Sequence, residues 1–290
     1  MPVSPWILAA RPRTLVAAIA PLLPAIALVW RDQVALNALL VLWLVVATTS
    51  IQIATNLFND AIDYMRGADQ QRIGPTRVSQ AGLLDHRSVL KAGYAMLGAA
   101  VLAGIPLVMQ GGWPIFLIGV LALFFAYAYT GGPLPLAYLG LGEVFVLLFF
   151  GLIAVTGSYW VLALHFSTYS LLAGAQLGCL SVVLLLVNNI RDLESDRAAN
   201  KRTIATRLGR RGALYELAAF LAIPYLLAPF WLPYSEPAAW LPCLTLPLAC
   251  GVQLLTMRAK DTQRFGEALS RAARLLLLFA VLLTVAIISF

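Results

Sequence analysis

Long apolar runs recur along almost the whole chain, and they restrict the folds that it can adopt. A run of about 20 apolar residues is long enough to cross a bilayer as a helix. Lipid offers no hydrogen-bond partners, so such a segment must satisfy its own backbone groups. We identify nine runs: Leu15–Trp30, Val34–Phe58, Ala92–Met109, Trp113–Thr130, Val144–Leu164, Ser170–Val187, Ala213–Trp231, Ala238–Met257 and Ala272–Phe290. The sequence therefore predicts an all-α integral membrane protein, with nine transmembrane helices in one domain over residues 1–290.

The composition supports a membrane protein. Hydrophobic residues make up 61% of the chain and charged residues only 11%, whereas soluble domains carry about 25% charged residues. The runs do not alternate between apolar and polar residues, so a transmembrane β-barrel is not predicted. Cys179, Cys243 and Cys250 fall within apolar runs and lack the spacing of metal ligands, which favours a packing role.

The basic residues are distributed unevenly among the loops. With the N-terminus inside, 19 of the 20 Lys and Arg residues fall on the inner side, and Arg31 falls outside. The positive-inside rule then places the N-terminus in the cytoplasm and the C-terminus outside. Trp30, Trp113, Trp231 and Trp240 fall near the outer interface, where indole rings prefer to lie. The net charge of +7 follows from this orientation and requires no nucleic-acid partner.

The first of two long, Asp-rich cytoplasmic loops opens with a polar stretch, NLFNDAIDYMRGADQQRIGPTR, at residues 56–77. Asn56, Asp60 and Asp63 are spaced four and three residues apart, so they share one face of a continuing helix, which Gly67 can end. A charge at mid-bilayer costs about 2.5–3.5 kcal/mol on insertion scales. A divalent cation removes that penalty, and Mg²⁺ prefers a few carboxylates together with phosphate oxygens. An ordinary solvated helix end is the alternative interpretation.

The second Asp-rich loop contains the stretch VNNIRDLESDRAANKRTIATRLG, at residues 187–209. Asn188, Asp192 and Asp196 are four residues apart and again share a helix face, with basic residues around them. A ladder of surface ion pairs is the alternative here. The two stretches follow the second and sixth apolar runs and resemble each other in order of residues. This pattern indicates a distant internal duplication with two facing half-sites.

Two carboxylate faces surrounded by cations indicate one class of substrate. Carboxylates hold Mg²⁺, Mg²⁺ holds a diphosphate, and Arg or Lys neutralises the remaining phosphate oxygens. The apolar part of the substrate would run into the helix bundle. A polyprenyl diphosphate has both parts.

Four stretches in order resemble the UbiA-type intramembrane aromatic prenyltransferases. They are ARPRTL at 10–15, NLFNDAIDYMRGAD with RIGPTR at 56–77, AYTGGPLPLAYLGLGE at 128–143 and NNIRDLESDRAANKRTIATRLG at 188–209. The resemblance is strongest to the subgroup that acts on 1,4-dihydroxy-2-naphthoate. Asn200 stands where a Gly is common in the family, which leaves the geometry of that turn open.

The resemblance also implies roles for individual residues. Mg²⁺–diphosphate binding is implied for Asn59, Asp60, Asp63 and Asp69 in the first motif and for Asp192 and Asp196 in the second. The four aspartates Asp60, Asp63, Asp192 and Asp196 are the expected catalytic residues. Further substrate-binding candidates are Asn56, Arg72, Arg77, Tyr129, Asn188, Lys201 and Arg202. For Tyr129, stacking on a cation or a naphthalene ring and simple core packing both remain open.

The implied reaction transfers a polyprenyl group from polyprenyl diphosphate to 1,4-dihydroxy-2-naphthoate, with loss of CO₂ and diphosphate, in menaquinone biosynthesis. It would take place in the bacterial inner membrane, with the active site facing the cytoplasm. Another aromatic acid, such as 4-hydroxybenzoate, is the alternative acceptor. A cation transporter is the alternative class of protein, although transporters place their ligands near the middle of the membrane on broken helices.

Overall fold

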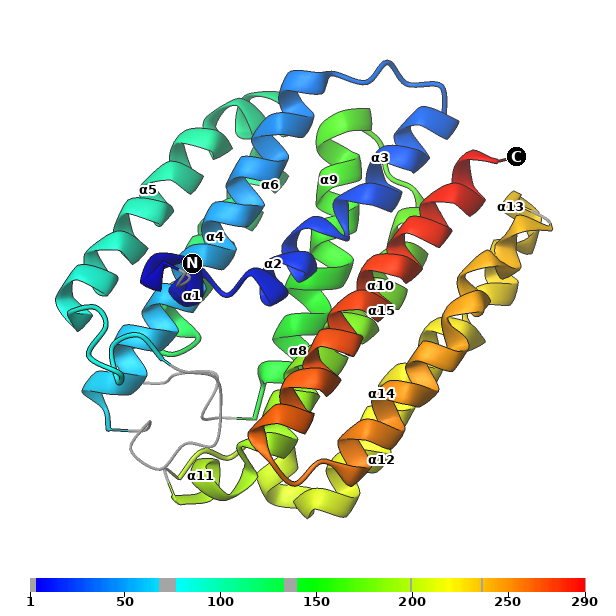
Figure 1. Ribbon diagram of the computed structural model, residues 1–290. Coiled ribbons are helices and arrows are strands. Elements are labelled where there is room, and N and C mark those ends of the chain that lie inside the picture. Colours follow the sequence, from blue (N-terminus) through cyan, green and yellow to red (C-terminus); the bar gives the residue numbers. More distant parts are fainter. Residues whose placement is uncertain (1–3, 68–76, 133–139, 199, 236, 290) are drawn as a thin grey trace.

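A computed structural model describes residues 4–67, 77–132, 140–198, 200–235 and 237–289, and within these ranges the regular structure is entirely helical (Figure 1). The elements are α1 (Pro5–Ala10), α2 (Pro12–Ile19), α3 (Leu22–Arg31), α4 (Ala38–Met65), α5 (His86–Gly111), α6 (Trp113–Ala128), α8 (Gly142–Leu147), η1 (Leu148–Leu152), α9 (Ile153–Ala163), α10 (Thr168–Arg191), α11 (Leu193–Ala198), α12 (Ile204–Leu226), η2 (Ala228–Trp231), α13 (Leu232–Ser235), η3 (Ala238–Thr245), α14 (Leu246–Arg258) and α15 (Thr262–Ile288).

Each predicted apolar run falls on one helix or on two or three consecutive helical segments. In the described part of the chain, eight helical segments are long and apolar enough to cross a membrane. The remaining run, Trp113–Thr130, corresponds to α6, which is apolar but has only 16 residues. The protein is therefore an all-helical integral membrane protein, and the count of nine spans stays a prediction.

Several helices extend further into the polar sequence than the apolar runs predicted. Helix α4 continues to Met65, α10 to Arg191, and α12 already begins at Ile204. The starts of α5, α12 and α15 are fixed by Asp85, Thr203 and Asp261, whose side chains accept backbone N–H groups of the first turn. Such caps favour helix in charged sequence. The second predicted loop is thus largely helical, with α11 inside it.

Helix α10 is the most buried of the candidate spans in the described chain, and it packs against α9 and α12 (Figure 1). Its contact with η1 depends on glycine. A Cβ atom on Gly151 would lie 2.4 Å from the carbonyl oxygen of Gly174 and 2.4 Å from the Cα of Gly178. Small residues of this kind let two membrane helices approach backbone to backbone.

Buried Gln176 joins α10 to α12 and η2 through hydrogen bonds. Gln176 Nε2 donates to the carbonyl oxygen of Pro224 at 2.7 Å, and Trp231 Nε1 donates to Gln176 Oε1 at 2.8 Å. Trp231 is only 1% exposed, so its ring packs inside the protein, and its position near the outer interface stays a prediction. Its indole N–H is satisfied inside the protein, whereas Trp30, Trp113 and Trp240 are exposed.

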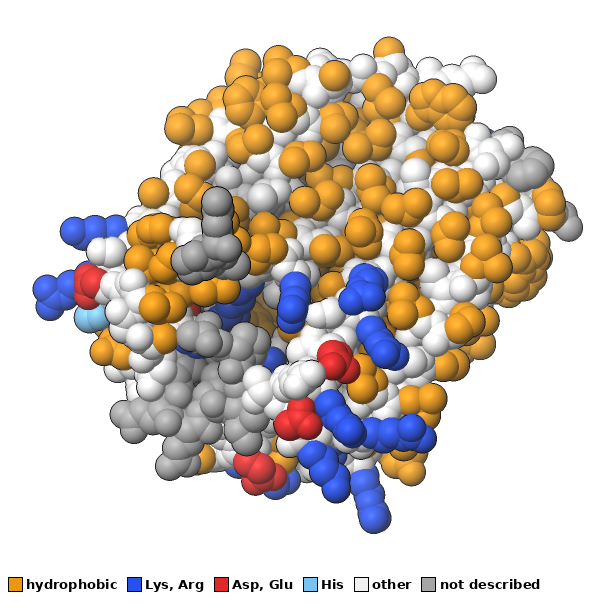
Figure 2. Space-filling view, in the orientation of Figure 1, with side chains coloured by type: hydrophobic (Ala, Val, Ile, Leu, Met, Phe, Trp, Pro, Cys, Tyr) orange, Lys and Arg blue, Asp and Glu red, His pale blue; other side chains and the backbone are white. Residues whose placement is uncertain are grey.

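The two ends of the bundle differ in charge. The C-terminal ends of α4 and α10, the short α11 and the turn before α15 lie at one end, and the C-terminus lies at the other (Figure 1). In the space-filling view, basic and acidic side chains gather at the end that carries α11, and hydrophobic side chains cover the rest of that face (Figure 2). Both acidic motifs therefore belong to one end of the molecule.

We expect Gln176→Leu to lower the stability of the folded protein, because Trp231 Nε1 and the carbonyl oxygen of Pro224 lose their buried partner. Each buried group without a partner costs about 1–3 kcal/mol. Unfolding in detergent, followed by heat or denaturant, measures the effect. Gln110→Leu, at an exposed position of α5, is the matched control. Equal stability of the two variants would contradict a role for this pair.

Candidate active site

The last turns of α4 carry the first acidic motif. Helical structure continues through Met65, so Asn56, Asp60 and Asp63 share one helix face as the spacing predicted. Asp60 is 2% exposed and Asp63 is 1% exposed. Two carboxylates this buried require compensating charge or hydrogen bonds.

The segment at residues 77–79 supplies that compensation. Arg77 Nη2 donates to Asp63 Oδ2 at 2.8 Å. The backbone N–H groups of Val78 and Ser79 donate to Asp60 Oδ2 and Oδ1 at 3.1 and 3.0 Å. Asp60 thus anchors a segment that follows it by 17 to 19 positions in the chain. The sequence had placed Arg77 near phosphate, and the structure brings it to Asp63.

The N-terminal segment contacts two more polar residues of α4, Asn56 and Asn59. Asn56 Nδ2 donates to the carbonyl oxygen of Ala10 at 2.8 Å and to Thr14 Oγ1 at 2.9 Å. Arg11 Nη2 reaches Asn59 Oδ1 at 3.4 Å. Asn56 is buried and ties the ARPRTL segment to α4, a contact that helical spacing alone did not reveal.

The second acidic motif spans the junction of α10 and α11. The backbone N–H of Asp192 donates to the carbonyl oxygen of Asn188 at 2.9 Å, and that of Asp196 donates to Asp192 at 2.7 Å. This four-residue pattern keeps the three residues stacked along one face, as the sequence predicted. Asp192 pairs with its neighbour Arg191 through two bonds of 2.7 Å, and Asp196 Oδ1 lies 3.5 Å from Lys201 Nζ.

Other predicted site residues make different contacts, are exposed, or lie outside the described residues. Asn188 Nδ2 donates to the carbonyl oxygen of Leu184 in its own helix at 3.0 Å, and Arg202 is exposed. Asp69 and Arg72 lie outside the described residues. The pairing of Arg191 with Asp192 was not predicted, because adjacent residues on a regular helix do not face each other. The pair forms here because Asp192 stands at the end of α10, where the regular helix stops.

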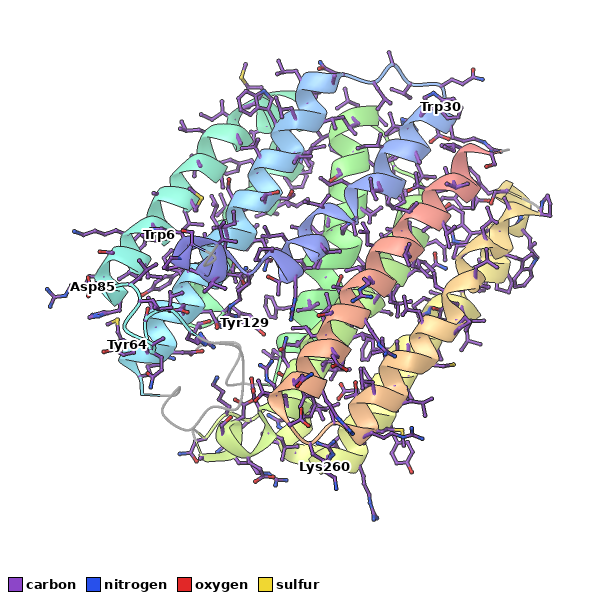
Figure 3. The ribbon with its side chains drawn as sticks, viewed as in Figure 1. Trp6, Trp30, Tyr64, Asp85, Tyr129 and Lys260 are labelled. Atoms are coloured by element: carbon purple, nitrogen blue, oxygen red, sulfur yellow. The ribbon has the colours of Figure 1, made fainter. Side chains whose placement is uncertain are left out.

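Tyr129 lies where the two motifs approach each other. It directly follows α6 and lies in the lower half of the bundle as drawn, towards the end that carries Lys260 and away from Trp30 (Figure 3). The next residue, Thr130, accepts a hydrogen bond from Asn59 Nδ2 of the first motif at 3.0 Å. A Cβ atom on Gly142 would lie 3.4 Å from the Tyr129 hydroxyl, and the adjacent Glu143 accepts a hydrogen bond from Asn189 Nδ2 of the second motif at 3.0 Å. Tyr129 therefore lies between contacts to both acidic motifs.

An apolar cavity of about 570 Å³ reaches Tyr129 from the hydrophobic part of the bundle. Its lining comes from α2, α4, α5, α6, α8, η1 and α9. The rings of Phe125, Phe145 and Phe149 form part of the wall, with centroids 4.5 to 5.9 Å apart. The sequence did not identify these three residues, because phenylalanines in an apolar run give no sign of which face they occupy.

The cavity opens at the surface of the bundle. Five of its lining side chains are at least 46% exposed, and they come from α5 and α6: Val101, Ile105, Met109, Phe116 and Val120. These exposed positions lie within apolar helices. An apolar chain can therefore reach the cavity from the side of the bundle.

The acidic residues have the chemistry of a magnesium site. In the described chain, no three His, Cys, Asp or Glu side chains already form a compact metal cage. However, Asp63 Oδ1 is buried and accepts no hydrogen bond from the residues that the structure describes. A buried carboxylate oxygen without a donor is unfavourable unless a cation occupies it. The donor set of carboxylates and an amide also suits a hard cation such as Mg²⁺.

Comparison with known proteins assigns this architecture. Residues 18–279 match the model of the UbiA prenyltransferase family. The chain is 38% identical over 234 residues to 1,4-dihydroxy-2-naphthoate octaprenyltransferase of Mycobacterium tuberculosis (strain ATCC 25618 / H37Rv), covering 78% of this chain and 79% of that protein. It is 33% identical over 277 residues to the protein of the same name from Mycobacterium leprae (strain TN), covering 93% and 90%.

A solved structure has the same fold. The UbiA homologue from Archaeoglobus fulgidus bound to GPP and Mg²⁺ superposes with a TM-score of 0.66 and 14% identity, covering 99% of this chain and all of that chain. At this identity the likeness concerns the fold alone.

We expect Asp60→Ala to release the segment at residues 77–79, because two backbone N–H groups lose their acceptor. Trypsin should then cut after Arg77 faster than in the unchanged protein, and gel or mass analysis of the fragments measures the rate. Asp60→Asn keeps one acceptor oxygen and should be intermediate, while Glu267→Ala on an exposed face of α15 is the control. Unchanged cleavage after Arg77 in Asp60→Ala would show that Asp60 is not the anchor.

Proposed function

The chain belongs to the UbiA prenyltransferase family, and from this premise we propose that it transfers a polyprenyl group from polyprenyl diphosphate to 1,4-dihydroxy-2-naphthoate. The bond between the allylic carbon and the diphosphate breaks, the same carbon joins the naphthalene ring, and the carboxylate leaves as CO₂. The product is demethylmenaquinol, in menaquinone biosynthesis. One observation carries the proposal in this structure: Tyr129 lines the apolar cavity and lies between contacts to both acidic motifs, made by Thr130 with Asn59 and by Glu143 with Asn189. An apolar tail with a diphosphate head requires those two surroundings side by side.

Mg²⁺ is the proposed cofactor, with ligands from Asn59, Asp60, Asp63, Asp69, Asp192 and Asp196. Bound there, it stabilises the negative charge that develops on the departing diphosphate. Asp63 offers its free Oδ1. The oxygens of Asp60 each accept one backbone N–H group, and a carboxylate oxygen retains a second lone pair. Asp60 can thus anchor residues 77–79 and still present an acceptor to the site.

The neighbouring cations bind the diphosphate oxygens in this proposal. Arg77 and Lys201 are held in the site by their ion pairs with Asp63 and Asp196. A guanidinium suits phosphate because it donates two parallel hydrogen bonds. Arg202 is exposed beside Lys201, and Arg72 completes the proposed set outside the described residues. In this proposal, these residues orient the leaving group at the end of the cavity that Tyr129 lines.

The cavity keeps the reactive end of the tail dry. Its mostly apolar lining excludes water, which would otherwise capture the allylic cation. Aromatic faces stabilise a nearby cation by about 0.5–2 kcal/mol, and Tyr129 and Phe145 offer such rings beside the acidic end. The carboxylates at that end also create a negative field, which favours a nearby carbocation more than neutral walls would.

The same proposal fixes the location and orientation. The protein is an integral membrane protein, and we place it in the bacterial inner membrane with the acidic end at the cytoplasmic face. Basic side chains surround that end (Figure 2), as expected for a cytoplasmic surface. A positive surface also attracts the diphosphate substrate. A cation path through the membrane finds less support, because the acidic motifs lie at one end of the bundle.

We expect the purified protein, with Mg²⁺, a polyprenyl diphosphate and carboxyl-labelled 1,4-dihydroxy-2-naphthoate, to release diphosphate and labelled CO₂ in equal amounts. A membrane-extractable prenylated naphthalene should accumulate at the same rate. Chromatography of the product together with trapping of CO₂ measures the reaction. Prenylation of 4-hydroxybenzoate in preference, or product without loss of CO₂, would contradict the naphthoate assignment and leave the prenyl transfer intact.

We expect Asp63→Asn to lower kcat by roughly 10²–10³, the typical effect of removing one electrostatic stabiliser of a transition state. The amide keeps the size of the side chain and an acceptor for Arg77, so folding should be preserved. Turnover and thermal unfolding are measured in parallel, with Asp85→Asn at the exposed start of α5 as the control. Full activity of Asp63→Asn would remove this carboxylate from the site.

A further inference from the structure

The connection between α6 and α8 contacts the first acidic motif at two points. Asn59 Nδ2 donates to Thr130 Oγ1 at 3.0 Å. Arg66 Nη2, at the end of α4, donates to the carbonyl oxygen of Gly132 at 2.8 Å. The residues that immediately follow α6 are therefore fixed to the helix end that carries Asp60 and Asp63.

The other end of the same connection contacts the second acidic motif, also at two points. Gly140 has a φ of 76°, and a Cβ atom there would lie 2.5 Å from the carbonyl oxygen of Arg202. Glu143, in the first turn of α8, accepts a hydrogen bond from Asn189 Nδ2 at 3.0 Å. The residues that lead into α8 thus pack against the segment that carries Asp192 and Asp196.

Tyr129 links the two ends of this connection. A Cβ atom on Gly142 would lie 3.4 Å from the Tyr129 hydroxyl. The phenol that borders the cavity therefore lies against the turn that presents Glu143. The two acidic motifs, far apart in sequence, are joined through Thr130, Tyr129, Gly142 and Glu143.

We propose that Glu143 is a positioning residue that, through Asn189, holds the second acidic motif in register with the first. This inference rests on the proposed function, because the register matters for a Mg²⁺–diphosphate site shared between the motifs. Asn189 precedes Asp192 by three residues, so a displacement of the last turn of α10 moves Asp192 with it. Glu143 is 3% exposed, and in the described chain it forms no ion pair. Its carboxylate accepts the hydrogen bond from Asn189.

The structure separates this role from direct catalysis. The hydrogen bond from Asn189 requires an acceptor oxygen at position 143 and no negative charge. Glutamine supplies that oxygen, whereas alanine does not. A residue that took a proton from the substrate would require the carboxylate itself, so Glu143→Gln distinguishes the two roles.

The test measures binding of geranyl thiolodiphosphate, a slowly reacting allylic diphosphate analogue, with MgCl₂ and with the protein in nanodiscs. Loss of an outer partner that orients metal ligands typically weakens metal affinity by about 10–100-fold. We expect Glu143→Ala and Asn189→Ala each to weaken Mg²⁺-dependent binding by about that factor. The double variant should be no weaker than either single variant, because both changes remove one interaction. Glu143→Gln should bind within about threefold of the unchanged protein.

Three results would overturn the proposal: unchanged binding in Glu143→Ala, additive losses in the double variant, or Glu143→Gln as impaired as Glu143→Ala. Glu194→Ala removes an exposed carboxylate from the same segment and is the matched control, with thermal unfolding recorded for every variant. If Glu143→Ala does not fold, Asn189→Ala and Glu143→Gln carry the test. The assay contains no aromatic acceptor, so failure to prenylate the naphthoate would count against the proposed function and not against this inference.

Discussion

The compensation of buried carboxylates is the constraint on which this structure depends. Asp60 and Asp63 lie almost fully buried at the end of a membrane helix, where unpaired charge is unfavourable. The chain meets this constraint locally: Arg77 pairs with Asp63, and two backbone N–H groups cap Asp60. The second motif does the same with Arg191 and Lys201. Each compensating contact also fixes a loop or a helix end, so the contacts that balance the buried charge also position the segments of the site.

The bundle and the acidic end perform complementary tasks. Helices α4, α5, α6 and α9 enclose apolar space, while the charged groups gather where those helices meet the aqueous side. Tyr129 belongs to both regions, since it lines the cavity, precedes Thr130, which is bonded to Asn59, and lies against Gly142. The glycine contacts between η1 and α10 and the Gln176 pair join α10 to the helical segments on either side of it.

Sequence reasoning predicted most of the helices and both acidic faces, because length, hydropathy and four-residue spacing are properties of a single segment. Asp60 and Asp63 lie on one face of α4 as predicted, and Asp192 and Asp196 keep the four-residue spacing across the junction of α10 and α11. The contacts of Asn56 with the N-terminal segment, the Arg191–Asp192 pair and the aromatic wall of the cavity were missed. Each depends on how separate segments meet or on where a helix stops. The helices were also predicted too short, because hydropathy falls at the membrane edge: α4 and α10 end later than predicted, and α5 and α12 start earlier, at the caps Asp85 and Thr203.

The side opening between α5 and α6 has a consequence for kinetics. A donor whose tail enters past exposed Val101 and Val120 comes from the surrounding lipid, so its effective concentration is its mole fraction in the bilayer and not its amount per volume of buffer. Turnover in vesicles should therefore follow surface dilution by inert phospholipid. The prenylated product can return to the same reservoir without ever being solvated by water.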